Sequence, residues 1–494
     1  MDNLMQALKG EANLAVKPRP YFNHSVSFKG VHDRKARTEM MEKVGLNVFF
    51  FPADMITGCD FLSDSGTTTM TDEQWAALHM GDESYGSNKG YFMLRDAVND
   101  TFGQGFWNEP TANRPNAFLF HQGRAAEDAL FSVLGALGEG QIIPSNGHFD
   151  TTEANIEANK IEAVNLFSSE LKDPNSTSKF KGNIDTNRLK TLLAESADKI
   201  PVVYITITNN TGGGQPVSMA NIKEASEIAN AAGKPLFLDS CRFAENAWFI
   251  QKNEEGYAQK SIKEIVREMF SYADGFTISF KKDGLSNMGG GLFLRDGGKF
   301  MQSYPQIPDM LTNLQILQEG HPTYGGMSGR DIMTLVVGLK TITRQEYLDA
   351  RVQQVIDFGQ AMVDAGIPVL TPFGGHAVYL DVNRFFEGTN MQPGDFGGIS
   401  FTAILLAAYG HRACELGYFA FGSYNGETNE EKFPEVNFVR FAVPRLRYEK
   451  TDLDSVVEAV KEIYENRDKI PPTDVIYGKE LPLRHFKARF EFKN

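Results

Sequence analysis

Short apolar runs alternate with amphipathic segments through the middle of the chain. Residues 202–208 (VVYITIT) are apolar and β-branched, which predicts a buried strand. Ser218 then precedes a segment whose apolar side chains recur at helical spacing as far as Gly233. Two further strands are predicted at Leu236–Asp239 and at residues 275–280. Strands and helices that alternate with short connections predict right-handed crossovers and a parallel sheet.

The second predicted helix has its own start signal. Ser261 and Glu264 form an S-x-x-E pattern, in which the two side chains cap the first turn of a helix. A polar residue lies at the end of each predicted strand. Asn209 and Asn210 follow the first strand, Asp239 ends the second, and Lys282 comes shortly after the third. Because functional groups gather beyond the carboxyl ends of parallel strands, we expect these side chains to lie together.

The C-terminal third has a different pattern. It predicts helices over residues 350–365, 401–409 and 453–465, and strands over 367–370, 377–381 and 436–442. This is typical of a smaller α+β domain. We therefore expect an N-terminal arm (1–32), a small domain built from residues 33–62 and 345–494, and a large domain over 63–344.

Composition narrows the class of protein. The 494 residues suggest two or three domains, and the net charge of −14 argues against a nucleic-acid or anionic-membrane binder. Three cysteines and nine scattered histidines suggest neither a disulfide framework nor a structural zinc site. No run approaches the roughly 20 apolar residues of a membrane span, and the N-terminus lacks the apolar core of a signal peptide. We expect a cytoplasmic enzyme.

Asp239 and Lys282 are the first candidates for chemistry. A buried aspartate is costly without a cation, and a buried lysine can form a Schiff base. Together they suit pyridoxal 5′-phosphate (PLP), whose aldehyde binds lysine and whose pyridinium nitrogen pairs with a carboxylate. The spacing fits equally well with a solvated Lys281-Lys282 loop and a helix-capping Asp239.

A possible phosphate site lies between an apolar run ending at Phe120 and a helical segment beginning near Ala125. Glycine at such a turn exposes backbone N–H groups and a helix N-terminus, to which Arg124 and the Ser279 hydroxyl could add charge and a hydrogen bond. Neither GxxxxGK[ST] nor GxGxxG occurs, so nucleoside triphosphate and dinucleotide sites lack their usual motifs.

Longer motifs follow one another in a set order. They include Asp64-Ser65-Gly66-Thr67, Gln122-Gly123-Arg124, Gly214-Gln215-Pro216, Asp239-Ser240-Cys241-Arg242, Ser279-Phe280-Lys281-Lys282 and Gly374-Gly375-His376-Ala377. From about Pro20 to its C-terminus, the chain resembles the β-eliminating lyases, the family of tryptophanase and tyrosine phenol-lyase. The resemblance implies the α/β fold of the aspartate-aminotransferase-like, type I PLP enzymes: a large domain with a mainly parallel sheet and a smaller α+β domain.

The resemblance also implies roles for cofactor-binding residues. Lys282 would form the Schiff base and remove the substrate Cα proton. Asp239 would pair with the pyridinium nitrogen, and Phe149 would stack on the ring. The remaining cofactor contacts would be Asn210 and Arg242 near the 3′-oxygen, and Gln122, Gly123, Arg124 and Ser279 at the phosphate, with Lys281 beside it.

Other implied roles concern substrate, metal and assembly. Arg440 would bind the substrate carboxylate, as a bidentate guanidinium suits, and Ser63 would line the substrate site. Tyr85 would reach the leaving group from a neighbouring subunit of a homotetramer. A potassium ion would bind Glu83 and the carbonyl oxygens of Gly66 and Asn287.

Four positions bear on the leaving group. Leu416 stands where tyrosine phenol-lyase has an arginine, while Asp150 and His485 match tryptophanase. His321 departs from both, because it replaces an apolar residue near the aromatic pocket, and a polar side chain there would suit another leaving group. Leu416, Asp150 and His485 favour β-elimination of L-tryptophan to indole, pyruvate and ammonia. Elimination from tyrosine or an S-substituted cysteine, a different PLP reaction, and a non-catalytic binding protein are the alternatives; retention of Lys282, Asp239 and Arg440 argues against the last.

Overall fold

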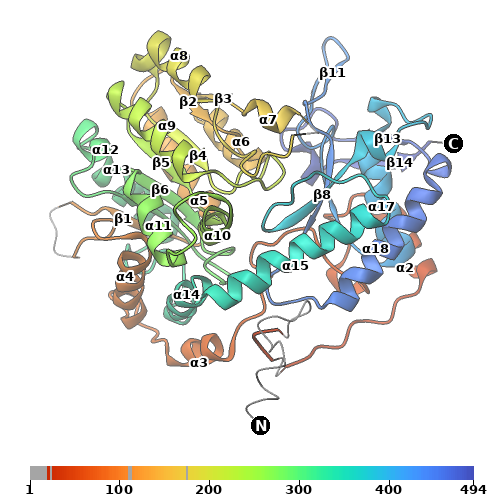
Figure 1. Ribbon diagram of the computed structural model, residues 1–494, viewed down its shortest axis with the longest axis horizontal. Coiled ribbons are helices and arrows are strands. Elements are labelled where there is room, and N and C mark those ends of the chain that lie inside the picture. The colour runs from red at the N-terminus through yellow and green to blue at the C-terminus, as the bar shows by residue number, and fades with distance from the viewer. Residues whose placement is uncertain (1–18, 23–24, 110–113, 174–175, 494) are drawn as a thin grey trace, which may run out of the picture.

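The apolar runs in the middle of the chain form the centre of a seven-stranded sheet (Figure 1). The structure, a computed structural model, describes residues 19–22, 25–109, 114–173 and 176–493, so most of the expected N-terminal arm lies outside the described residues. In order across the sheet, the strands are β1 (Ala117–Phe120), β7 (Gly290–Leu294), β6 (Gly275–Ser279), β5 (Leu236–Asp239), β4 (Val203–Thr206), β2 (Ile142–Ser145) and β3 (Glu162–Asn165).

Five of these strands are parallel, as the sequence predicted. β3, β2, β4, β5 and β6 pair in parallel with one another. β7 runs antiparallel to β6, and the edge strand β1, which is antiparallel to β7, again runs in the direction of the five. In this register Thr206 lies beside Asp239, which in turn lies beside Thr277. The carboxyl ends of β4, β5 and β6 therefore meet at one end of the sheet.

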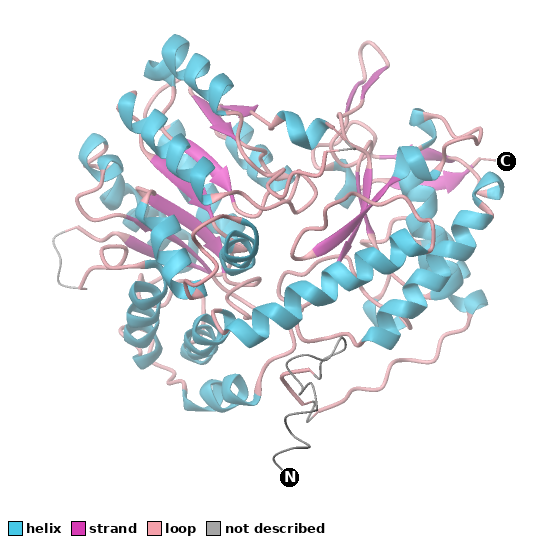
Figure 2. Cartoon of the chain, viewed as in Figure 1, coloured by secondary structure: helices cyan, strands magenta, loops and turns pink. Residues whose placement is uncertain are grey.

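Both faces of the large sheet are covered by helices (Figure 2). Val203 and Ile205 point into one hydrophobic core and Tyr204 into the other, which explains why β4 reads as a continuous apolar run. One face is packed by α4 (Lys89–Phe102), α8 (Thr186–Ser196), α9 (Met219–Ala231), α10 (Phe243–Asn253), α11 (Ile262–Ser271) and α14 (Gly329–Ile342). The other is packed by α5 (Gly123–Gly135), α6 (Asp150–Ala158), α12 (Lys299–Ser303) and α13 (Ile307–Glu319).

The predicted helix signals are confirmed. The Ser218 hydroxyl accepts a hydrogen bond from the Asn221 backbone N–H at the start of α9, and Gly233 follows the helix with φ +75°. At the start of α11, the Ser261 and Glu264 side chains each bond the other's backbone N–H in a capping box.

A second, three-stranded sheet lies in the C-terminal part of the chain, in the order β8 (Ala377–Asp381), β12 (Phe438–Ala442) and β9 (Cys414–Leu416). Around it pack α15 (Gln345–Asp364), α16 (Val382–Phe385), α17 (Gly397–Tyr409) and α18 (Lys450–Glu465). The strand expected over residues 367–370 is wrong: Val369 makes only an isolated bridge to Leu380. Pro368 has no backbone N–H to extend a ladder.

The segment before residue 63 packs with this smaller sheet. Met41 of α2 (Arg34–Lys43) and Leu46 share a hydrophobic cluster with Phe396 and Leu406 of the C-terminal part. The long helix α15 crosses the front of the molecule, from the side of the large sheet to the side of the small sheet (Figure 1). This packing fits the expected division into domains, whose boundaries stay a prediction.

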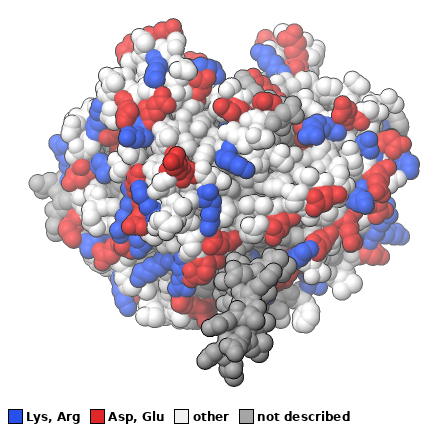
Figure 3. Space-filling view, in the orientation of Figure 1, with Lys and Arg blue, Asp and Glu red and all other residues white. Residues whose placement is uncertain are grey.

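The remaining elements are short or peripheral. They are α3 (Asp72–Met80), α7 (Ser169–Lys172), the hairpins β10 (Ser423–Asn425)–β11 (Glu430–Lys432) and β13 (Thr473–Tyr477)–β14 (Arg489–Phe492), and the 3₁₀ turns η2 (Ala53–Met55), η3 (Ala197–Lys199), η4 (Pro393–Asp395), η5 (Arg467–Lys469) and η6 (Arg484–Phe486). Among the described residues, no helix is long and apolar enough to span a membrane. Acidic and basic side chains are interspersed on the face shown in Figure 3.

Candidate active site

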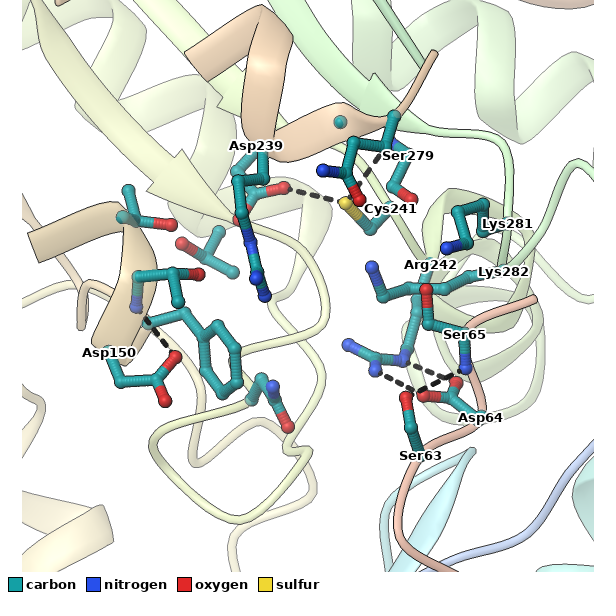
Figure 4. A pocket seen from close by; sticks show the side chains of 18 of the residues that line it. Ser63, Asp64, Ser65, Asp150, Asp239, Cys241, Arg242, Ser279, Lys281 and Lys282 are labelled. Carbon is teal, nitrogen blue, oxygen red and sulfur yellow. Dashed lines mark hydrogen bonds and ion pairs between the residues drawn. The ribbon is translucent and has the colours of Figure 1, made fainter. Parts of the chain in front are cut away.

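A cavity of about 200 Å³ opens where the carboxyl ends of β4, β5 and β6 approach the smaller sheet. Lys282 extends toward its middle from the turn after β6 (Figure 4). Most of the residues singled out from the sequence line this cavity: Ser63, Gln122, Gly123, Arg124, Phe149, Asp150, Asn210, Asp239, Arg242, Ser279, Lys281, Lys282, Leu416, Arg440 and His485.

Five sequence-derived candidates lie outside the cavity lining. Tyr85 is 63% exposed, and its ring centroid lies 5.7 Å from that of His321. The Glu83 carboxylate pairs with Arg330 at 3.0 Å, while the Asn287 side-chain amide donates to the Gly66 carbonyl at 2.9 Å. A single chain therefore brings Tyr85 and His321 together, and Gly66 and Asn287 together, without bringing either pair into the cavity.

Asp239 ends β5 with its carboxylate buried. The Cys241 thiol donates to Asp239 Oδ1 at 3.1 Å and accepts from the Ser279 backbone N–H at 3.3 Å, which ties the ends of β5 and β6 together. Burial raises the pKa of Asp239, against the lowering effect of the Cys241 hydrogen bond and of Lys282. In the described part of the chain, no cation lies within ion-pair distance of this carboxylate. It suits a ligand that brings a protonated ring nitrogen.

The loop before α5 is shaped for an anion. Gln122 stands at the N-cap position and no side chain caps the helix, so its first N–H groups are open to a ligand. Gly123 is required there because a Cβ atom would lie 2.6 Å from the Ser279 Cβ and 2.8 Å from the Ser279 backbone. Arg124 and Lys281 both line the cavity and add positive charge to it, and burial together with the charge of Lys282 lowers the pKa of Lys281.

A second buried carboxyl group, Glu127, was missed by the sequence reasoning. It lies one turn into α5, where it accepts from the Thr152 hydroxyl at 3.0 Å and from the Tyr204 hydroxyl at 3.4 Å. Burial, and then the charge of Asp239, raise the pKa of Glu127 to about 8. An acidic residue among the apolar positions Ala126 and Leu130 was the available signal.

The Arg440 guanidinium lines the cavity without a carboxylate partner among the described residues. Its guanidinium donates from Nη2 to the Leu62 carbonyl at 3.0 Å and from Nη1 to Asn210 Oδ1 at 3.4 Å, while the buried Nε has no partner. Among the described residues, no carboxylate lies within 4.0 Å of it. A buried, unpaired arginine on a cavity wall suits a ligand carboxylate.

Behind the cavity lies a buried network of charges. Arg242 forms a two-point contact with Asp64, with Nη2–Oδ1 at 2.8 Å and Nε–Oδ2 at 3.1 Å. Arg445, with a fully buried side chain, contacts Asp64 at 3.0 Å, Glu245 at 2.9 Å and Asp283 at 2.7 Å. Asp64 and Arg242 stand in motifs named from the sequence, but the sequence gave no signal that Arg445 joins three carboxylates. The network fixes the segment at Asp64 against the large sheet.

An apolar compartment with one polar pair forms another wall. His485 Nε2 lies 3.0 Å from Asp150 Oδ2, and both side chains are buried. The His485 ring packs against Phe486 at 4.0 Å and Phe49 at 5.9 Å between centroids. Leu416 lines the same cavity. This wall can hold an aromatic ring and place a proton donor beside it.

Comparison with solved structures identifies the fold. A serine palmitoyltransferase from Sphingomonas wittichii superposes with a TM-score of 0.54 over 84% of this chain and 89% of that chain, at 12% sequence identity. A second serine palmitoyltransferase, from S. paucimobilis with bound PLP, gives a TM-score of 0.53 over 84% and 88% of the two chains at 12% identity. The α/β architecture is that of the type I PLP-dependent enzymes, as the sequence predicted.

Sequence comparison identifies closer relatives. The tryptophanases of Hyphomonas neptunium and Salinibacter ruber are each 40% identical, over 93% and 96% of this chain and 95% of each relative. The tyrosine phenol-lyase of Lacrimispora saccharolytica is 36% identical over 97% of both chains. The profile of the family "Beta-eliminating lyase" matches residues 60–459. On these matches, and with the site residues in one cavity, the chain belongs to the β-eliminating lyase family.

Proposed function

We propose that the protein is a PLP-dependent carbon–carbon lyase that converts an aromatic L-amino acid, preferentially L-tryptophan, to pyruvate, ammonia and the free aromatic product. The observation that carries the proposal is the cavity itself: Lys282, Asp239 and the unpaired Arg440 line one space in a chain 40% identical to tryptophanases.

The cavity suits PLP part by part. Gln122, Gly123, Arg124, Ser279 and Lys281 would hold the phosphate at the N-terminus of α5. Asp239 would pair with the pyridinium nitrogen, and Phe149 would stack on the ring. Asn210 and Arg242 would lie at the 3′-oxygen. When bound, PLP supplies an electron sink for the charge left at the substrate Cα.

The chain's own residues would then divide the remaining tasks. Arg440 holds the substrate carboxylate, with Ser63 on the same wall, and so presents the Cα–H bond to Lys282. The Lys282 amine, free of other partners in the described structure, takes up the Cα proton.

Leaving-group chemistry favours indole. Indole departs only after protonation at carbon, so a positioned acid is needed. The Asp150–His485 pair lies in an aromatic wall with Leu416, and an apolar residue at 416 suits an indole ring. L-Tyrosine is the second candidate, because relatives 36% identical are named tyrosine phenol-lyase.

Tyr85 supports an assembly with shared sites. Tyr85 is exposed beside His321 and lies outside the cavity of its own chain. In an assembly, it could therefore reach the leaving group bound in the cavity of a neighbouring subunit. We propose a homotetramer, a potassium ion bound by Glu83 with the Gly66 and Asn287 carbonyls, and a cytoplasmic location.

Pyruvate release tests the proposal. The purified protein is supplied with PLP and potassium, and L-tryptophan and L-tyrosine are compared in parallel. Pyruvate from L-tryptophan in excess over L-tyrosine supports the proposed preference, and pyruvate from neither substrate would overturn the proposed function. Chloride salts of sodium and potassium, compared at equal ionic strength, test the metal separately.

A further inference from the structure

The side-chain oxygen of Asn210 receives hydrogen-bond donors from three other residues. The Tyr379 hydroxyl lies 2.8 Å from Asn210 Oδ1, His376 Nε2 lies 3.2 Å away and Arg440 Nη1 lies 3.4 Å away. Tyr379 also lies 3.1 Å from the Asn210 backbone carbonyl. The shortest of these contacts belongs to the tyrosine.

Strand pairing places Tyr379 beside the substrate-binding arginine. In the antiparallel pair β8–β12, Tyr379 stands directly opposite Arg440, so their side chains share one face of the small sheet. Both side chains are buried. Tyr379 therefore links a residue of the small sheet to Asn210 beyond β4 of the large sheet.

His376 completes the arrangement as a neutral donor. Burial, with Arg242 next, holds the pKa of His376 well below its usual range. Its Nδ1 is buried without a partner, whereas Nε2 lies next to the Asn210 oxygen, which assigns the single ring proton to Nε2. Because all three neighbours donate, the Asn210 oxygen must face them, and its NH₂ group is turned away from them.

We infer that Tyr379 is a positioning residue for substrate-carboxylate recognition: its hydroxyl fixes the Asn210 amide and, through it, the orientation of Arg440. The inference rests on the proposed function, in which Arg440 binds the carboxylate. Without the hydroxyl, Asn210 loses its shortest hydrogen bond and can rotate, and the Nη1 contact of Arg440 loses a fixed acceptor.

The test uses Tyr379→Phe, which removes one oxygen and adds no volume. Tyr347→Phe is the matched control, because the Tyr347 hydroxyl is equally buried but has no hydrogen-bond partner. For the PLP-loaded proteins, dissociation constants are measured from the change in cofactor absorbance with two ligands. L-Alanine has no leaving group, and L-alaninamide additionally lacks the carboxylate charge.

We expect Tyr379→Phe to weaken L-alanine binding about ten-fold, equivalent to about 1.4 kcal/mol, and to leave L-alaninamide binding within about two-fold. Tyr347→Phe should leave both constants unchanged. With the substrate that is turned over, KM should rise about ten-fold with kcat within about three-fold. Equal weakening of both ligands, or no weakening of either, would overturn the positioning role.

A double variant tests the route through Asn210. In an Asn210→Ala background, Tyr379→Phe should cause no further loss of L-alanine affinity, and additive losses would contradict the inference. Failure of the proposed function gives a different result. If the wild-type protein itself binds L-alanine no better than L-alaninamide, the carboxylate role of Arg440 is wrong. If the wild type binds L-alanine more tightly than L-alaninamide and Tyr379→Phe has the same two dissociation constants, only the role of Tyr379 is wrong.

Discussion

Arg242 and Arg445 share one buried carboxylate, that of Asp64: Arg242 contacts Oδ1 at 2.8 Å and Oδ2 at 3.1 Å, and Arg445 Nη1 lies 3.0 Å from Oδ2. Arg242 lines the cavity, whereas Arg445 lies behind it and reaches two further carboxylates, those of Glu245 and Asp283. Arg242, which lines the cavity, is thus anchored through Asp64 to Arg445, Glu245 and Asp283, which lie outside the cavity lining.

Removing Arg445 should destabilise the fold strongly. Arg445→Met leaves three buried carboxylates without their shared cation, so we expect the free energy of unfolding to fall by about 3–5 kcal/mol. Urea denaturation of the variant measures the loss. Arg447→Met, two residues away at an exposed position, is the control and should change stability by less than about 0.5 kcal/mol. Equal stability of the two variants would contradict the role given to the network.

Lys282 and Lys281 are adjacent, but they should behave differently on substitution. Lys282→Ala removes the proposed base and should lower kcat by at least about 1,000-fold. Lys281→Ala removes only charge near the phosphate site, so its main effect should be weaker PLP binding, with turnover retained at saturating PLP. Steady-state pyruvate assays over a PLP titration separate the two effects. A Lys282→Ala protein with wild-type kcat would refute the mechanism.

Glu127 should make the stability of the PLP-free protein depend on pH. Its folded-state pKa of about 8 lies above the usual 4.5, so the folded state binds the extra proton between these values. The stabilisation is complete below pH 4.5 and is lost as pH rises through 8. Between pH 5 and 8.5, the wild type should lose at least about 1 kcal/mol relative to Glu127→Gln, whose amide does not ionise. Urea unfolding midpoints of both proteins at both pH values measure this difference. If the wild type and Glu127→Gln change in stability equally between the two pH values, Glu127 does not hold the proton.

His485 should matter for indole but not for a leaving group that needs no carbon protonation. His485→Gln should reduce kcat for L-tryptophan about 100-fold, because the proposed acid beside the aromatic wall is lost. A thiolate leaves without that proton, so pyruvate release from S-ethyl-L-cysteine should change by less than about three-fold. Both rates are measured on one preparation, so loss of folded protein would reduce them together. Such a parallel loss would assign His485 a packing role.

The parallel core of the fold followed from local sequence patterns. The apolar runs of β4, β5 and β6 are buried on both faces, and Ser218 and Ser261 cap the helices between them. Once these strands are parallel, their carboxyl ends coincide, which is why Asp239 and Lys282 could be placed in one site. The strand expected over residues 367–370 does not form, although the segment is apolar, because Pro368 has no backbone N–H with which to extend a ladder.

Residues whose roles depend on distant partners could not be predicted this way. Tyr379 gains its role from standing opposite Arg440, and that register is visible only when β8 and β12 are paired. Glu127 depends on Thr152 and Tyr204, which come from a helix and a strand far along the chain. A sequence pattern reports which residues face a core but not which polar groups meet inside it.

The most direct measurement is the stoichiometry of products from L-tryptophan. Purified wild-type protein, loaded with PLP in potassium buffer, is incubated with L-tryptophan beside Lys282→Ala, and indole, pyruvate and ammonia are quantified against the substrate consumed. We expect one of each product per tryptophan from the wild type and none from the variant. Consumption of tryptophan without pyruvate, or equal turnover by the variant, would contradict β-elimination at Lys282.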